Sequence, residues 1–309
     1  MSAAGTSLLT VPRTVDTRPP RRYAPSPLLR GTVRQSLIAL TLVLSSACAP
    51  QASRPVPDVA TGLVGIPIED ETLLNGTWGV MFEFATILTL PVVGDRNAGS
   101  QQLWLHTRTW DEGQQRYNES FRWCWLDVWE VEGNKLVVPD STIERHPAHT
   151  FTSTVNGLNG TWEASRILDL WGVRNLPDPE TTALPTRHNW QTPPQSDWIF
   201  DEDEDGKPAT SARAHGITEG DVFQVVRGLY GFKGTVINAD RIQGLVNVRS
   251  YQQNAIKADR VIAEGESVIR QDADPLNTWF DMIRMTDGAT CGDVKAAHAD
   301  GRLARRRPF

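Results

Sequence analysis

The stretch LNGTWGVMFEF, residues 74–84, indicates the fold class of this chain. From Trp78 onward the even positions carry large apolar side chains, including Val80, Phe82 and Phe84, whereas the odd positions are mixed. Alternation with a period of two is the pattern of a strand that buries one face. Asn-Gly at 75–76 is a turn signal. The segment therefore predicts a turn that leads into a half-buried strand.

Other β-rich segments follow, separated by turn sequences such as VGDRNAGS, DEGQQ and TDGAT. Many short strands with few helices favour an all-β body, either an antiparallel up-and-down barrel or a β-sandwich. Segment 251–267 has some helical character, and we predict a short helix or an excursion between strands there. The further expected strands span 102–110, 121–131, 161–168, 212–217, 222–230, 234–238, 242–251 and 278–285.

A proline-bearing stretch at 176–194 interrupts the strands and predicts a surface loop or a linker. We expect one β-barrel domain over residues 71–290, because neither half alone has enough strands to close a barrel. Trp190 and Trp198 lie beside this stretch and are the tryptophans expected to be exposed. They are the candidate residues for binding a small apolar or glycan ligand, although most of the 11 tryptophans are expected to fill the core.

Gly76-Thr77-Trp78 resembles the Gly-x-Trp signature that opens the first strand of the lipocalins. The resemblance covers three residues, so it implies a lipocalin-like barrel and no particular ligand. A second LNGTW, at 158–162, continues in a less regular pattern. We interpret both copies as turns entering strands, not as a duplicated domain or a catalytic motif.

The first 47 residues have the composition of a signal peptide. Six arginines precede an apolar run at 37–44, which is too short for a membrane span of about 20 residues but has the size of a signal-peptide core. A start at Val33 would give a compact signal, so we interpret residues 1–32 as a start-site artefact.

Ser45-Ser46-Ala47-Cys48 resembles the end of a bacterial lipoprotein signal, although the leucine of that motif stands one place too early, at Leu44. The resemblance implies lipidation of Cys48 and attachment to a membrane, with the outer membrane favoured because the next residue is not aspartate. Periplasmic release or secretion is the alternative, and a Cys48 without either role is a third reading. Residues 48–70 would then be a flexible tether, and residues 291–309 a C-terminal tail.

If Cys48 carries lipid, Cys124 and Cys291 remain as a pair. In an oxidising compartment they would form a disulfide. Two separate buried thiols are the alternative.

Charge excludes one class of partner. Residues 48–309 contain 25 basic and 36 acidic side chains, a net charge of −11. A body this acidic repels phosphate backbones, so we expect no binding to nucleic acid.

The segment DEDEDGKPATSA, residues 201–212, is the most specific local motif. Asp201, Asp203 and Asp205 occupy positions 1, 3 and 5 of an EF-hand-type loop, Gly206 occupies position 6, and Lys207 would offer its carbonyl at position 7. The spacing predicts a weak Ca²⁺ site.

The later positions of that loop lack ligands, because alanine stands at 209 and 212. Further oxygens would have to come from Glu219, Asp221 or water. A solvated acidic turn without an ion is the alternative.

No nucleophile elbow, zinc-protease motif, Walker loop or dinucleotide fingerprint is present. His146 and His149 flank Pro147-Ala148, and in an extended segment we expect them to be poorly placed to share a metal. The sequence favours a non-catalytic envelope protein, either ligand-binding or structural. A secreted glycan-acting hydrolase whose residues meet only in the fold is the alternative.

Overall fold

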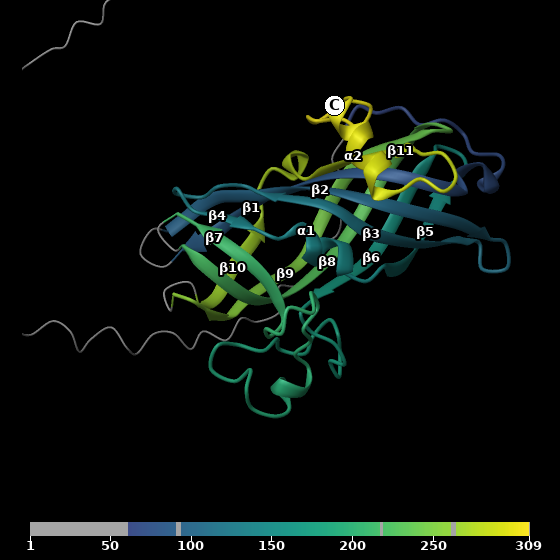
Figure 1. The fold of residues 1–309 in the computed structure, drawn as a ribbon. Helices are drawn as coiled ribbons and strands as arrows, with labels where there is room; N and C mark the ends of the chain where they lie inside the picture. The colour runs from purple at the N-terminus through teal and green to yellow at the C-terminus, as the bar shows by residue number, and fades with distance from the viewer. Residues whose placement is uncertain (1–60, 91–93, 217–218, 261–263, 309) are drawn as a thin grey trace, which may run out of the picture. The chain divides into compact units, whose positions relative to one another are not determined.

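The computed structural model describes residues 61–308 except 91–93, 217–218 and 261–263 (Figure 1). All of these belong to one compact unit, Ala49–Phe309. The predictions for the signal peptide, the start site and Cys48 lie outside the described residues.

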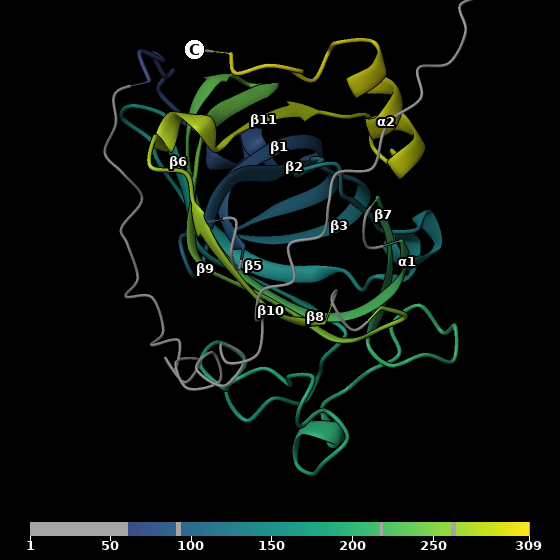
Figure 2. The ribbon, with the colours of Figure 1, turned by 90° about the vertical axis from the view of Figure 1, so that its left-hand side faces the viewer.

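The described strands form one antiparallel sheet of eleven. Hydrogen bonds run through eight of them as a closed ring, in which each strand pairs with the next one along the chain and the last pairs with the first (Figure 2). The predicted antiparallel all-β architecture is confirmed. The ring strands are β1 (Gly76–Leu90), β2 (Gly94–Asp111), β3 (Arg116–Val128), β5 (His149–Asn156), β6 (Thr161–Trp171), β8 (Gly220–Asn238), β9 (Arg241–Ala258) and β11 (Trp279–Arg284).

Three strands lie outside the ring. β7 (Thr210–His215) pairs with β8 and with the short β4 (Lys135–Val137), and β10 (Gly265–Gln271) pairs with β9 and β1. Helical elements are short: α1 (Asp140–Arg145), α2 (Cys291–Ala299), and the 3₁₀ turns η1 (Glu71–Leu74), η2 (Gln195–Asp197) and η4 (Pro275–Asn277). Among the described residues there is no helix with the length and apolar character needed to cross a membrane.

Of the two alternatives for 251–267, the helix is wrong for the described residues, because β9 runs on to Ala258 and β10 begins at Gly265. Its polar side chains are paired with a neighbouring strand and with the 172–209 loop. Gln253 Nε2 donates to Gln224 Oε1 at 2.6 Å, and Asn254 Nδ2 donates to the Pro185 carbonyl at 2.9 Å. These partners are distant in the sequence, so the local pattern contained no strand signal.

Aromatic side chains fill the ring. The even positions of β1 point inward, as predicted, with Trp78 and Phe82 fully buried. Trp104 stacks on Phe121 with ring centroids 4.2 Å apart, and Phe82 meets Phe232 edge-on at 5.4 Å. Buried aromatic packing of this kind stabilises the ring from within.

One ion pair is buried in this aromatic core. Arg108 Nη2 donates to Glu119 Oε2 at 3.2 Å, and both side chains have no solvent exposure. The guanidinium lies over the ring of Trp162, 4.8 Å from its centroid, and Trp162 Nε1 donates to Glu119 Oε1 at 3.2 Å. A charge removed from water in this way depends on its partner.

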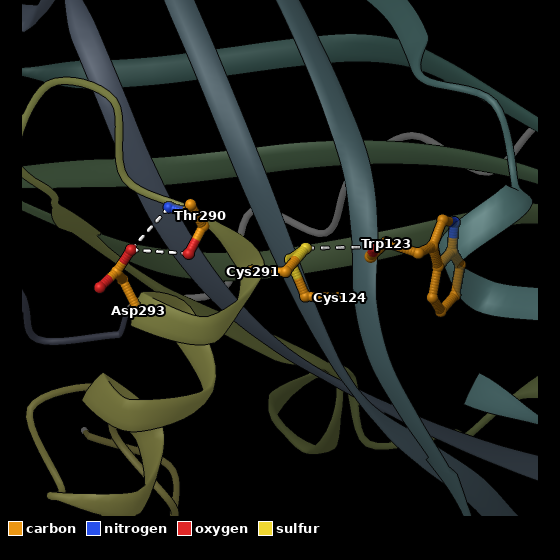
Figure 3. The surroundings of a disulfide bond; sticks show 5 residues. All are labelled: Trp123, Cys124, Thr290, Cys291 and Asp293. Carbon is orange, nitrogen blue, oxygen red and sulfur yellow. Dashed lines mark hydrogen bonds between the residues drawn. A yellow bond between two sulfur atoms is a disulfide. The ribbon is translucent and has the colours of Figure 1, made fainter. Parts of the chain in front are cut away.

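On the outside, α2 packs against β1, β2 and β3. Thr290 caps the helix: its backbone N–H and its hydroxyl both donate to Asp293 Oδ2, each at 2.7 Å (Figure 3). Cys291, the first residue of the helix, forms a disulfide with Cys124 on β3. Of the two alternatives for these cysteines, the disulfide is the one observed.

The long connection between β6 and β7, residues 172–209, covers the outer face of β8 and β9. Its Val173, Leu176 and Leu184 pack with Phe223 and Ile256 of those strands. The predicted proline-bearing loop is therefore a surface loop of a single body, attached to the sheet by its own small apolar cluster.

Candidate functional site

Two clusters of ligand-type side chains lie at the end of the ring where β5 begins and β6 ends. The first is the predicted set Asp201, Asp203 and Asp205, and the second is His146, His149 and Asp169. In each set one donor atom from every residue lies within 4.8 Å of the others. Both sets adjoin α1, because His146 directly follows it and Asp203 bonds to its Thr142.

The acidic loop closes on itself as its sequence predicts. Asp201 accepts hydrogen bonds from the backbone of Asp205 at 3.2 Å and of Gly206 at 3.0 Å. Gly206 has a φ of 78°, a left-handed conformation that glycine adopts without strain. The glycine thus permits the turn that brings the three carboxylates together, and these acidic groups could hold a metal ion.

Asp203 is the buried member of this loop, at 4% exposure. Its Oδ2 accepts from the Thr142 hydroxyl at 2.9 Å and from the Ser211 backbone at 3.0 Å, whereas its Oδ1 is buried without a hydrogen-bond partner in the described structure. Burial raises the pKa of the Asp203 carboxyl, although these two hydrogen bonds oppose the shift.

The other residues considered for this loop have different surroundings. Glu219 and Asp221 pair with Arg213, at 3.3 and 3.2 Å, instead of completing the loop. Lys207 donates its backbone N–H to Asp205 Oδ1 at 2.7 Å, and its ammonium lies 5.5 Å from the centre of the Phe223 ring.

The second cluster is made of histidine and aspartate. His146 Nε2 lies 2.6 Å from His149 Nε2 and 3.1 Å from Asp169 Oδ1. His149 Nε2 lies 3.2 Å from the same Asp169 oxygen. Three donor atoms from α1's end, β5 and β6 therefore form one small triangle.

The expectation that His146 and His149 are poorly placed to share a metal is wrong. The chain bends at His146, which directly follows α1 and has φ −57° and ψ 128°, and β5 begins three residues later at His149. The segment is therefore not straight and extended, and the bend allows the two imidazoles to meet, with ring centroids 4.7 Å apart.

Neighbouring groups orient these side chains. His146 Nδ1 is hydrogen-bonded to Glu202, whose other carboxylate oxygen accepts from the Gly172 backbone and the Thr210 hydroxyl, both at 2.7 Å. Trp171 stacks on the His146 imidazole at 3.9 Å and donates its indole N–H to Asp169 Oδ2 at 2.9 Å.

Burial and charge act on the two histidines in opposite ways. Burial alone would lower the pKa of His146, but hydrogen bonds to Asp169 and Glu202 outweigh it and raise the pKa to about 9. For His149, burial dominates and lowers the pKa. The neutral imidazole, the form that coordinates metals, is therefore favoured at His149, whereas a metal ion at His146 would have to displace a proton.

The two clusters are joined through consecutive residues. Glu202 contacts His146, while the next residue, Asp203, contacts Thr142 through its side chain and Arg145 through its carbonyl. The sequence motif predicts the acidic loop but assigns no role to Asp169, Trp171 or Glu202. The only local signal for the second cluster was the His-Pro-Ala-His spacing.

The two tryptophans predicted as ligand-binding residues lie elsewhere. Trp190 and Trp198 are partly buried and pack against the apolar cluster that fixes the 172–209 loop to β8 and β9. Comparison of the chain with protein-family models and with curated protein sequences finds no match to either.

Proposed function

We propose that this is a non-catalytic, lipid-anchored envelope protein of bacteria that binds Ca²⁺ at the loop of Asp201, Asp203 and Asp205. One observation carries the calcium assignment: three carboxylates converge around Gly206, and the buried Asp203 has an oxygen without a partner. Carboxylate oxygens are the ligands that Ca²⁺ prefers. The cation would neutralise a group that is costly to bury alone.

The disulfide supports an exported location, because such bonds persist in oxidising compartments. The lipid anchor rests on the resemblance around Cys48. Mass spectrometry of the mature protein tests it: a diacylated Cys48 as first residue is expected, and an unmodified N-terminus at another position contradicts the anchor.

A structural role is favoured over a small ligand held inside the ring. Trp78, Trp104 and Trp162, which a ligand cavity would expose, are each at most 1% exposed. Trp104 and Trp162 pack against other aromatic rings, and the Trp78 ring is covered by the guanidinium groups of Arg108 and Arg284. The apolar interior is occupied by the protein's own side chains. We therefore assign function to the loops at the end of the ring, not to its interior.

Calorimetric titration with Ca²⁺ tests the site. We expect one ion per chain with a Kd of about 10⁻⁴–10⁻³ M, because the loop supplies fewer ligands than a full EF-hand. Asp201→Asn combined with Asp205→Asn removes two charges without changing side-chain size and should abolish binding. Asp300→Asn, at an exposed aspartate after α2, is the matched control and should bind as wild type. A flat wild-type trace contradicts the calcium assignment.

A further inference from the structure

We propose that His146, His149 and Asp169 form a second site, which binds a divalent first-row transition metal ion of the zinc class. This inference is independent of calcium at the acidic loop. It rests on the convergence of two imidazole nitrogens and one carboxylate oxygen at the end of the ring where β5 begins and β6 ends.

The spacing of the donor atoms matches shared coordination. Ligands about 2.0–2.1 Å from one ion, at tetrahedral or octahedral angles, lie roughly 2.9–3.4 Å apart. The two nitrogen–oxygen distances, 3.1 and 3.2 Å, fall within this range. The nitrogen–nitrogen distance of 2.6 Å is shorter, as in a hydrogen-bonded pair, and has to widen slightly around an ion.

A proton is the alternative occupant. One proton on His146 Nε2 can bond to His149 or to Asp169, but it cannot give all three atoms a short, linear bond. A metal ion coordinates all three at once. The charges also balance, because one divalent cation with neutral imidazoles offsets the buried carboxylates of Asp169 and Glu202.

The atoms that do not face the ion are already held. Glu202 is hydrogen-bonded to His146 Nδ1, and the Trp171 indole donates to Asp169 Oδ2. Phe121 stacks on the His149 ring with centroids 5.2 Å apart. A carboxylate behind a ligating histidine and a donor behind a ligating carboxylate are the outer contacts that metal sites use to fix their ligands. The preorganised side chains lose little freedom when the ion binds.

The donor set separates this site from the acidic loop. Two imidazoles select zinc and its neighbours in the first transition row, whereas an all-carboxylate set favours Ca²⁺ or Mg²⁺. Among the described residues, His146, His149 and Asp169 supply three ligands, so a water or another small oxygen or nitrogen donor would complete four-coordination.

Titration of the chelator-treated protein with Co²⁺ tests the proposal, with Zn²⁺ competition as the second measurement. Wild type is expected to bind one Co²⁺ with the visible absorption of nitrogen and oxygen ligands, and Zn²⁺ should displace it. His149→Ala removes the most exposed ligand and should weaken Zn²⁺ binding by a factor of at least about 100. His188→Ala, which removes an exposed histidine of the 172–209 loop, is the matched control and should leave binding unchanged.

X-ray absorption of the zinc-loaded wild type keeps the test independent of whether His149→Ala folds. Two imidazoles and oxygen donors around one zinc ion are the expected result. We expect a Kd in the micromolar range. If wild type binds neither Co²⁺ nor Zn²⁺ at a free metal concentration of about 10⁻⁴ M, roughly 100 times that Kd, the proposal is overturned. A folded His149→Ala that binds like wild type overturns it as well. Neither result bears on Ca²⁺ binding by the acidic loop.

Discussion

Replacing Cys124 and Cys291 together by alanine is expected to lower the free energy of unfolding by about 4–5 kcal/mol. The disulfide joins residues 167 positions apart, and closing a loop of that length removes much of the entropy of the unfolded chain in the chain-entropy treatment. The disulfide also fixes α2 to β3, so we expect the helix to detach more readily from the sheet in the variant. Guanidinium unfolding followed by tryptophan fluorescence measures the change.

Reduced wild type is the control for this variant. It should unfold at nearly the same denaturant concentration as the double alanine variant, because both lack the same covalent link. Equal midpoints for oxidised wild type and the variant would contradict the stabilising role of the bond.

Glu119→Gln is expected to destabilise the protein by about 3–5 kcal/mol, because it leaves the Arg108 charge buried without a counter-charge. The guanidinium is enclosed by aromatic rings and has no exposure, so water cannot replace the lost carboxylate. Equilibrium unfolding in guanidinium measures the effect.

The paired variant Arg108→Met with Glu119→Gln separates charge from packing. It removes both charges, so it should be more stable than Glu119→Gln alone. If Glu119→Gln alone is as stable as wild type, the Arg108–Glu119 pair is not shielded from water as its zero exposure implies.

The all-β class was predictable because its signals are local. Alternation in β1 places Trp78 and Phe82 inside the ring without reference to any partner strand. The acidic loop was predictable for the same reason: aspartates two residues apart before a glycine converge within one turn. The cysteine pairing was one of two open alternatives, since sequence gives no distance between β3 and α2.

The histidine cluster was not predictable from its own segment. Asp169 reaches His149 only because β5 and β6 form a hairpin, and Glu202 arrives from the long loop that follows β6. For a related reason, a helix remained one of two alternatives for the segment that contains the end of β9. Its glutamine and asparagine side chains are paired by β8 and by the 172–209 loop, and neither partner is visible in a local pattern.

The central claim is that the end of the ring bearing α1 is where this protein binds cations. Crystals grown with Zn²⁺ and measured on both sides of the zinc absorption edge test it most directly. We expect an anomalous peak within bonding distance of His146 Nε2, His149 Nε2 and Asp169 Oδ1, with Glu202 still bonded to His146. A zinc-loaded crystal with no peak among these three atoms, and zinc bound only at other histidines, would contradict the account.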